Sequence, residues 1–155
     1  RKHAQAARWS QTVLPILIRP FMRWKREQAS SHRSPSFPEH GIVNVCSCMT
    51  HHRTLKVVCV SIEGMHIASP ICYDALTYKQ LMEIGYFPCA PVYPTLAVSL
   101  DMLELVSILF VHSAPNERAW AVTITKYLKN RGHEFSTGDS LRRWFAAALA
   151  QYQVL

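Results

Sequence analysis

The chain has 155 residues, of which 49% are hydrophobic and 10% aromatic, and it contains five glycines. This composition can form one domain or two small ones, and it excludes a fully disordered chain. Seventeen Lys and Arg residues against ten Asp and Glu residues give a formal net charge of +7. Because the sequence starts at Arg1 and ends at Leu155 inside an apolar run, we expect it to be a piece of a longer protein.

The positive charge is concentrated in the first 35 residues. They carry eight basic side chains and one acidic side chain, a balance of +7, whereas residues 36–155 carry nine of each. A basic segment on a neutral body is typical of contact with a polyanion, either nucleic acid or an anionic membrane. A solvated helix face and a nuclear-import signal are the alternatives, because the charges are scattered.

No segment has the pattern of a secretory signal or a membrane-spanning helix, so we expect no membrane partner. The apolar run at 13–18 is short and contains Pro15, and the run at 96–111 is interrupted by Asp101 and Glu104. The second run is also shorter than the ~20 residues that a spanning helix needs. Without a signal peptide, five cysteines favour a reducing compartment, where a Cys-x-Cys pair indicates metal or redox chemistry.

The N-terminal segment is predicted to be helical over residues 2–14. Pro15 and Pro20 should each end or kink a helix, since proline lacks the N–H group and its ring collides with the preceding turn. A second short helix is expected over 20–28. Residues 29–40 are rich in Ser and Pro and have the composition of an exposed linker.

A β-hairpin is predicted next. Residues 42–45 form a short apolar strand candidate, and 55–62 form a second one that is rich in β-branched residues and ends at the turn signal 63–64. Cys46 and Cys48 lie between the two strands, at the expected tip of the hairpin. Two thiolates one residue apart cannot easily bridge each other, but they can bind one soft metal ion from the same side.

A second pair of donors follows at Cys72 and Asp74, before a helix predicted over 75–84 with its stop at Gly85. A helix N-terminus favours a thiolate. Together with Cys46 and Cys48, these residues would complete the tetrahedron that structural Zn²⁺ prefers. Asp74 stands where a fourth thiol is expected, and it is either a ligand or the helix cap.

Other donors are open to the same site. If Asp74 only caps the helix, His51 or His52 can take the fourth position. Cys59 lies inside the β-rich run and Cys89 between two prolines, and both are predicted to pack in the core.

The C-terminal part is predicted to be mostly helical. After a proline-rich extended segment at 86–94, helices are expected over 95–112, from an Asn116 cap to a stop before Gly132, and from about residue 137 onward. The last helix shows a full core stripe at i, i+3, i+4, i+7, i+8 and i+11. Its members are Leu141, Trp144, Phe145, Ala148, Leu149 and Tyr152.

One acidic pair and one basic set are candidates for binding. Asp101 and Glu104 share a helix face and could hold Mg²⁺, but a two-metal site needs a third carboxylate, so we expect a solvent-facing helix side. Trp9, Phe21 and Trp24 lie among basic residues and can stack on bases or dock this segment onto the body. The candidate phosphate contacts are Arg8, Arg19, Arg23, Lys25 and Arg26.

Several local patterns together resemble one family. They are Arg8-Trp9 with the segment 14–22, the Cys46-x-Cys48 pair, Cys72, Gly85-Tyr86-Phe87-Pro88-Cys89-Ala90-Pro91 continuing to Pro94-Thr95-Leu96-Ala97-Val98, Ala114-Pro115-Asn116 with Ala119-Trp120, and Ser140-Leu141-Arg142-Arg143-x-Phe145. The chain resembles, over nearly its whole length, the CxC-type cysteine-cluster region associated with fungal KDZ transposases. The 85–91 segment with its downstream Leu-Ala-Val is the most specific part.

The resemblance implies a structural zinc site that holds or recognises transposon DNA in the nucleus. In the family, the cluster precedes an RNase H-like catalytic domain, which this chain would lack. Cys46 and Cys48 match the first Cys-x-Cys, and Cys72 matches the first cysteine of the second pair. Asp74 departs from the family pattern, which leaves metal binding by this copy open.

We therefore predict an α+β protein in three parts. They are a basic N-terminal helical arm with a linker (1–40), a small zinc-stapled β-hairpin in the cysteine cluster (41–94) and a C-terminal helical bundle (95–155). The predicted role is non-catalytic DNA contact, with no small-molecule substrate. A protein–protein interaction or homo-oligomerisation module is the alternative, as is a degenerate transposon remnant that binds nothing.

Overall fold

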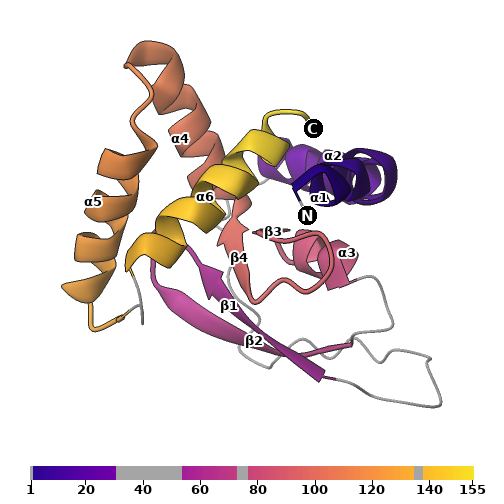
Figure 1. Ribbon diagram of the computed structural model, residues 1–155, viewed down its shortest axis with the longest axis horizontal. Helices are drawn as coiled ribbons and strands as arrows, with labels where there is room; N and C mark the ends of the chain where they lie inside the picture. The colour runs from indigo at the N-terminus through magenta and orange to yellow at the C-terminus, as the bar shows by residue number, and fades with distance from the viewer. Residues whose placement is uncertain (1, 31–53, 73–76, 135–137) are drawn as a thin grey trace.

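The computed structural model describes residues 2–30, 54–72, 77–134 and 138–155, which form a mixed sheet with helices packed beside it (Figure 1). The four strands are β1 (Thr54–Val60), β2 (Met65–Cys72), β3 (Tyr86–Pro88) and β4 (Leu96–Ser99). Their spatial order is β2-β1-β4-β3. The predicted α+β class is confirmed.

The centre of the sheet is β1, which confirms the strand predicted over 55–62. It pairs in parallel with β4 and antiparallel with β2. A tight turn joins β1 to β2, and in this turn the Ser61 N–H donates to the Gly64 carbonyl at 2.9 Å. The hairpin partner observed is therefore β2, which was not predicted. A strand that follows after a tight turn closes a shorter loop than one across a nine-residue gap. The partner predicted at 42–45 lies outside the described residues.

Side chains alternate along β1, and those on each of its two sides enter a different buried cluster. Val57 and Cys59 are buried in a small cluster with Leu81 of α3 (Thr77–Glu83). Val60 faces the main core on the other side. The helix predicted over 75–84 is thus confirmed in its described part, and it ends at Gly85, whose φ of 81° is the left-handed conformation that glycine adopts without strain.

Three helices complete the C-terminal part: α4 (Leu100–His112), α5 (Glu117–Lys129) and α6 (Gly138–Tyr152). The Asn116 cap is confirmed, since its Oδ1 accepts from the Ala119 N–H at 2.9 Å. α6 packs on β3, β4, α4 and α5. All members of its predicted stripe are buried except Trp144, which is 37% exposed.

The start of the helix predicted over 95–112 is wrong. Leu96–Ser99 is instead strand β4, and α4 begins at Leu100 with Ser99 as its cap, whose Oγ accepts from the Met102 N–H at 3.3 Å. Ala97 and Val98 pair with β1 on one side and β3 on the other. This two-sided pairing overrides the helical pattern, because it satisfies the backbone groups of a fully buried segment.

The N-terminal segment is one helical unit rather than two helices broken at the prolines. It consists of α1 (Lys2–Arg8), the π-helical segment η1 (Trp9–Val13) and α2 (Leu14–Ser30). The Leu14 N–H donates to the Trp9 carbonyl, an i→i−5 bond. This wider turn precedes Pro15 and relieves the clash that a proline ring makes with an ordinary α-helical turn. Pro20 lies inside α2 and is buried.

Aromatic rings attach this helical unit to the body. Trp9 stacks on Phe87 of β3 with ring centroids 5.7 Å apart. Phe21 stacks on Trp24 at 6.0 Å and meets Tyr152 of α6 edge-on at 5.7 Å. These residues belong to the main core, to which each of the three predicted segments contributes. The N-terminal helical unit is therefore docked on the body, as in the alternative that we left open for its aromatic residues.

Candidate nucleic-acid interface

Three arginines form an exposed stripe along α2. Arg19, Arg23 and Arg26 follow one another at i, i+4 and i+7, a spacing that places them on one helix face. All three side chains are exposed. Leu17 and Trp24 are buried on the opposite face, and their burial turns the stripe outward. We call this set the α2 arginine stripe, and it spans about 10 Å at 1.5 Å per residue.

Helix α3 adds charge beside the stripe. A hollow of about 450 Å³ lies between α2 and α3, and its charged lining residues are Arg19, Arg23, Lys79 and Glu83. Lys79 Nζ lies 3.9 Å from Glu83 Oε1, as expected for an i, i+4 pair. The lining therefore carries three basic groups and one acidic group. Lys79 was not predicted, because no local pattern links it to arginines more than 50 residues earlier.

The aromatic residues of this segment do not face solvent. Trp9, Phe21 and Trp24 are only 6–7% exposed, and their rings pack in the core. Base stacking by these rings, one of the two readings of the sequence, is therefore wrong. Arg8, the last residue of α1, is exposed beside the buried Trp9. Along the described part of the N-terminal helical unit, the arginines are exposed and these three rings are buried, an arrangement that suits phosphate contacts rather than base readout.

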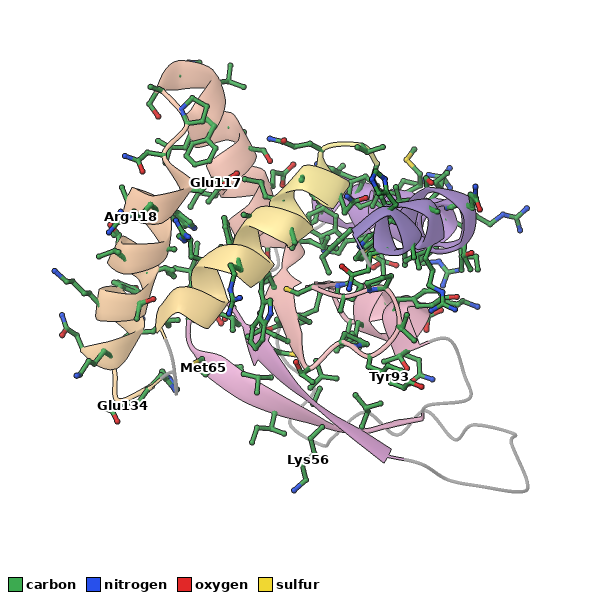
Figure 2. All side chains as sticks on the ribbon, viewed as in Figure 1. Lys56, Met65, Tyr93, Glu117, Arg118 and Glu134 are labelled. Carbon is green, nitrogen blue, oxygen red and sulfur yellow. The ribbon has the colours of Figure 1, made fainter. Side chains whose placement is uncertain are left out.

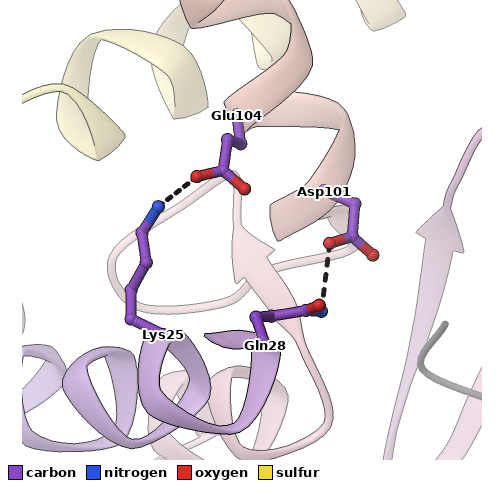
Figure 3. A network of polar contacts seen from close by, with 4 residues as sticks. All are labelled: Lys25, Gln28, Asp101 and Glu104. Carbon is purple, nitrogen blue, oxygen red and sulfur yellow. Dashed lines mark hydrogen bonds and ion pairs between the residues drawn. The ribbon is translucent and has the colours of Figure 1, made fainter. Parts of the chain in front are cut away.

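Lys25 differs from the four arginines, because its ammonium group is engaged within the molecule. Figure 3 shows Lys25 Nζ paired with the Glu104 carboxylate of α4, next to a hydrogen bond from Gln28 Nε2 to Asp101 Oδ1 of 3.2 Å. Lys25 and Glu104 are each 38% exposed. Lys25 Nζ also lies 5.4 Å from the centroid of the Trp24 ring. The four residues of Figure 3 thus hold the end of α2 against α4.

Asp101 and Glu104 are consequently not a plain solvent-facing pair, because each carboxylate bonds to a side chain of α2. Burial and the nearby Glu104 and Glu63 carboxylates raise the pKa of Asp101, and the Lys25 ammonium opposes this shift. Within the described part of the chain, no three His, Cys, Asp or Glu side chains are grouped so that they could hold a metal ion. No local pattern links these carboxylates to α2, since their partners lie more than 70 residues away.

The predicted zinc ligands can be placed only in part. Cys46, Cys48 and Asp74 lie outside the described residues, as do the alternatives His51 and His52. Cys72 is the last residue of strand β2 rather than a residue at the helix N-terminus, as had been predicted, because its backbone is paired with Thr54 at the start of β1.

This pairing bears on how the cysteines can meet. Thr54 is six residues after Cys48, and six residues span at most ~20 Å. The chain length therefore permits the Cys-x-Cys pair to approach Cys72, because β1 begins beside it.

Cys59 and Cys89 pack in the core, as predicted. Cys59 exposes none of its surface and Cys89 exposes 7%. Burial raises the pKa of the Cys59 thiol to about 12 and also raises that of Cys89. Both thiols therefore stay protonated near neutral pH and pack as small apolar groups.

No protein-family model matches the chain, and neither does any curated protein or solved structure. Over the described residues, every helix is too short or too polar to cross a bilayer.

Proposed function

We propose that the chain is a non-catalytic cysteine-cluster region of a KDZ-type transposase that contacts DNA in the nucleus. The observation that carries the proposal is the α2 arginine stripe, in which three exposed guanidinium groups share one face beside a basic hollow. The family itself is proposed on the sequence resemblance alone.

The donors of the stripe suit a phosphate backbone. A guanidinium group binds phosphate oxygens through its planar fork of N–H donors, and three of these groups share one face over about 10 Å of helix. Three arginines can therefore neutralise about three phosphates, with Arg8 and Lys79 as further contacts. Contacts of this kind are independent of base sequence and release counterions. The expected activity is weakly specific and strongly dependent on salt.

The test is a salt titration of duplex binding, followed by fluorescence anisotropy. With three phosphate contacts, the slope of log K against log salt is about −2.7, so affinity should fall about 40-fold between 50 and 200 mM salt. Changing Arg19, Arg23 and Arg26 to Gln should remove this share of the slope and leave only the smaller dependence due to further contacts such as Arg8 and Lys79.

The matched control removes the same charge from another helix. The control changes Lys126 and Lys129, in the last turn of α5, and Arg131, which follows the helix, to Gln; all three are exposed. This control should retain a slope near the wild-type value. Equal weakening by the two triple variants would mean that net charge, and not the stripe, governs binding, and the proposal would fail.

We also propose that Zn²⁺ organises the segment that contains Cys46 and Cys48, with Cys72 as a further ligand and Asp74 or a nearby histidine as the fourth. Binding energy at a structural zinc site is folding energy, so the metal would order this segment. The chelator-free protein should contain about one zinc per chain, and the Cys46→Ser, Cys48→Ser double variant almost none. Near-zero zinc in both proteins would remove the site.

A second candidate function, homo-oligomerisation or another protein–protein contact, is favoured by the outer face of α4. Leu105, Ile108, Leu109 and Val111 there are 41–79% exposed. Exposed apolar side chains at this spacing are typical of helix docking. Sedimentation velocity separates the roles: a Leu105→Ser, Ile108→Ser variant should lose self-association that persists at high salt. If the wild type is monomeric at high concentration, homo-oligomerisation is excluded.

A further inference from the structure

A second basic hollow lies between the start of α5 and the middle of α6. It has a volume of about 510 Å³, and its polar lining residues are Asn116, Glu117, Arg118, Arg142 and Arg143. Figure 2 labels Glu117 and Arg118 at the beginning of α5. The hollow shares no lining residue with the one beside the α2 arginine stripe.

The three arginines of this hollow are exposed and carry no internal partner among the described side chains. Arg118, Arg142 and Arg143 make no ion pair or ring contact there. This contrasts with Lys25, which is paired with Glu104. Three guanidinium groups therefore converge on one hollow, and within its described lining only the Glu117 carboxylate offsets their charge.

The backbone at the start of α5 adds positive potential to the hollow, although the arginine side chains are the main evidence for the site. The first i→i−4 bond of the helix runs from the Trp120 N–H to the Asn116 carbonyl at 3.0 Å, and the Asn116 side chain caps the Ala119 N–H. The N–H groups of Glu117 and Arg118 precede these bonds, so they add positive potential at the same end of the hollow.

We propose that this hollow binds phosphate groups. Planar guanidinium groups bind phosphate oxygens through paired hydrogen bonds, and an anion in the hollow would relieve the repulsion among three like charges. A volume of about 510 Å³ is enough for two linked phosphates. The site uses none of the residues of the proposed DNA contact, so it goes beyond that function. Its phosphates come either from a free phosphorylated compound or from a nucleic-acid backbone.

The first experiment titrates the full chain with pyrophosphate at low ionic strength, followed by two-dimensional ¹H–¹⁵N NMR. Saturable shifts are expected at the amides of 116–118 and 142–146. The Arg142→Gln, Arg143→Gln variant should bind about tenfold more weakly, because it loses two charge-assisted contacts. The control variant Lys126→Gln, Lys129→Gln removes the same charge outside the hollow and should bind within about twofold of the wild type. The same spectra report whether each variant is folded.

The outcome is decisive in each direction. Pyrophosphate shifts that do not saturate, or equal affinity in the arginine and lysine double variants, overturn the site. A second arm measures duplex binding by anisotropy. If the Arg142→Gln, Arg143→Gln variant loses duplex affinity and the lysine control variant does not, the phosphates belong to nucleic acid. If the arginine variant keeps its duplex affinity but loses pyrophosphate binding, the ligand is a free phosphorylated compound. If the salt titration shows that the α2 arginine stripe does not bind DNA, the pyrophosphate and duplex measurements on the Arg142→Gln, Arg143→Gln variant can still be interpreted, because they change different residues.

Discussion

Replacing Leu17 by alanine tests whether the N-terminal helical unit belongs to the core. The Leu17 side chain exposes none of its surface. The substitution removes three buried carbons at about 0.8 kcal/mol each, and a cavity term adds to this loss. We expect the free energy of unfolding to fall by about 3 kcal/mol, a large share of the roughly 5–15 kcal/mol that stabilises an ordinary domain.

The neighbouring Ile18 supplies a matched control. Ile18→Ala also removes three carbons, but Ile18 is 50% exposed, so we expect a loss of about 1 kcal/mol or less. Urea denaturation is followed by far-UV circular dichroism and by fluorescence of the tryptophans on this helical unit and on the body. Equal losses in the two variants would refute the docked helix. The docked helix would also be refuted if Leu17→Ala lowered the helical circular dichroism signal at low urea but left the urea midpoint of the remaining unfolding transition unchanged.

Gly85 and Gly132 have φ near +80°, so alanine at either position should lower the free energy of unfolding by about 1 kcal/mol; unchanged thermal midpoints would contradict this. The Lys25→Met, Glu104→Gln double-mutant cycle should give a coupling of about 0.5–1 kcal/mol that weakens with salt, and a coupling of zero would show that the pair does not hold α2. The folded-state pKa of Cys59, about 12, lies above its ordinary value, so its contribution to stability is complete below pH about 9 and is lost as pH rises toward 12. Cys59→Ala should therefore flatten the alkaline loss of unfolding free energy by up to about 1.4 kcal/mol per pH unit, and parallel curves would contradict this.

The elements predicted best are those whose signals are local. α5 is bounded by Asn116, whose side chain caps it, and by Gly132, whose φ is 85°. The stripe that begins at Leu141 predicted both α6 and the face that it buries. β1 was recognised from its β-branched run and the turn signal at Gly64. In each case, the residues that specify the element lie within the element or beside it.

β4 shows where local reading fails. Leu96–Ser99 is apolar and joins a helical run without a break in pattern, so the sequence predicted helix. The segment is a strand because β1 and β3 flank it, and these partners lie about 36 and 10 residues earlier. Periodicity cannot separate a short buried strand from the first turn of a buried helix.

The candidate interface shows the same division. The positive charge of residues 1–35 and the i, i+4, i+7 spacing of Arg19, Arg23 and Arg26 are readable from the sequence. The burial of Trp9 against Phe87 and the pairing of Lys25 with Glu104 are not, because each depends on a contact between distant segments.

The amino-acid order alone was enough to specify the α+β class, both ends of α5, the buried stripe of α6 and the positive charge of the N-terminal segment, since caps, turns and periodic stripes act over a few residues. Three-dimensional packing was needed to choose which side of that helix faces water, which cations stay unpaired and which apolar runs become strands. These choices depend on burial and on hydrogen-bonding partners far along the chain, and no short window of sequence contains them.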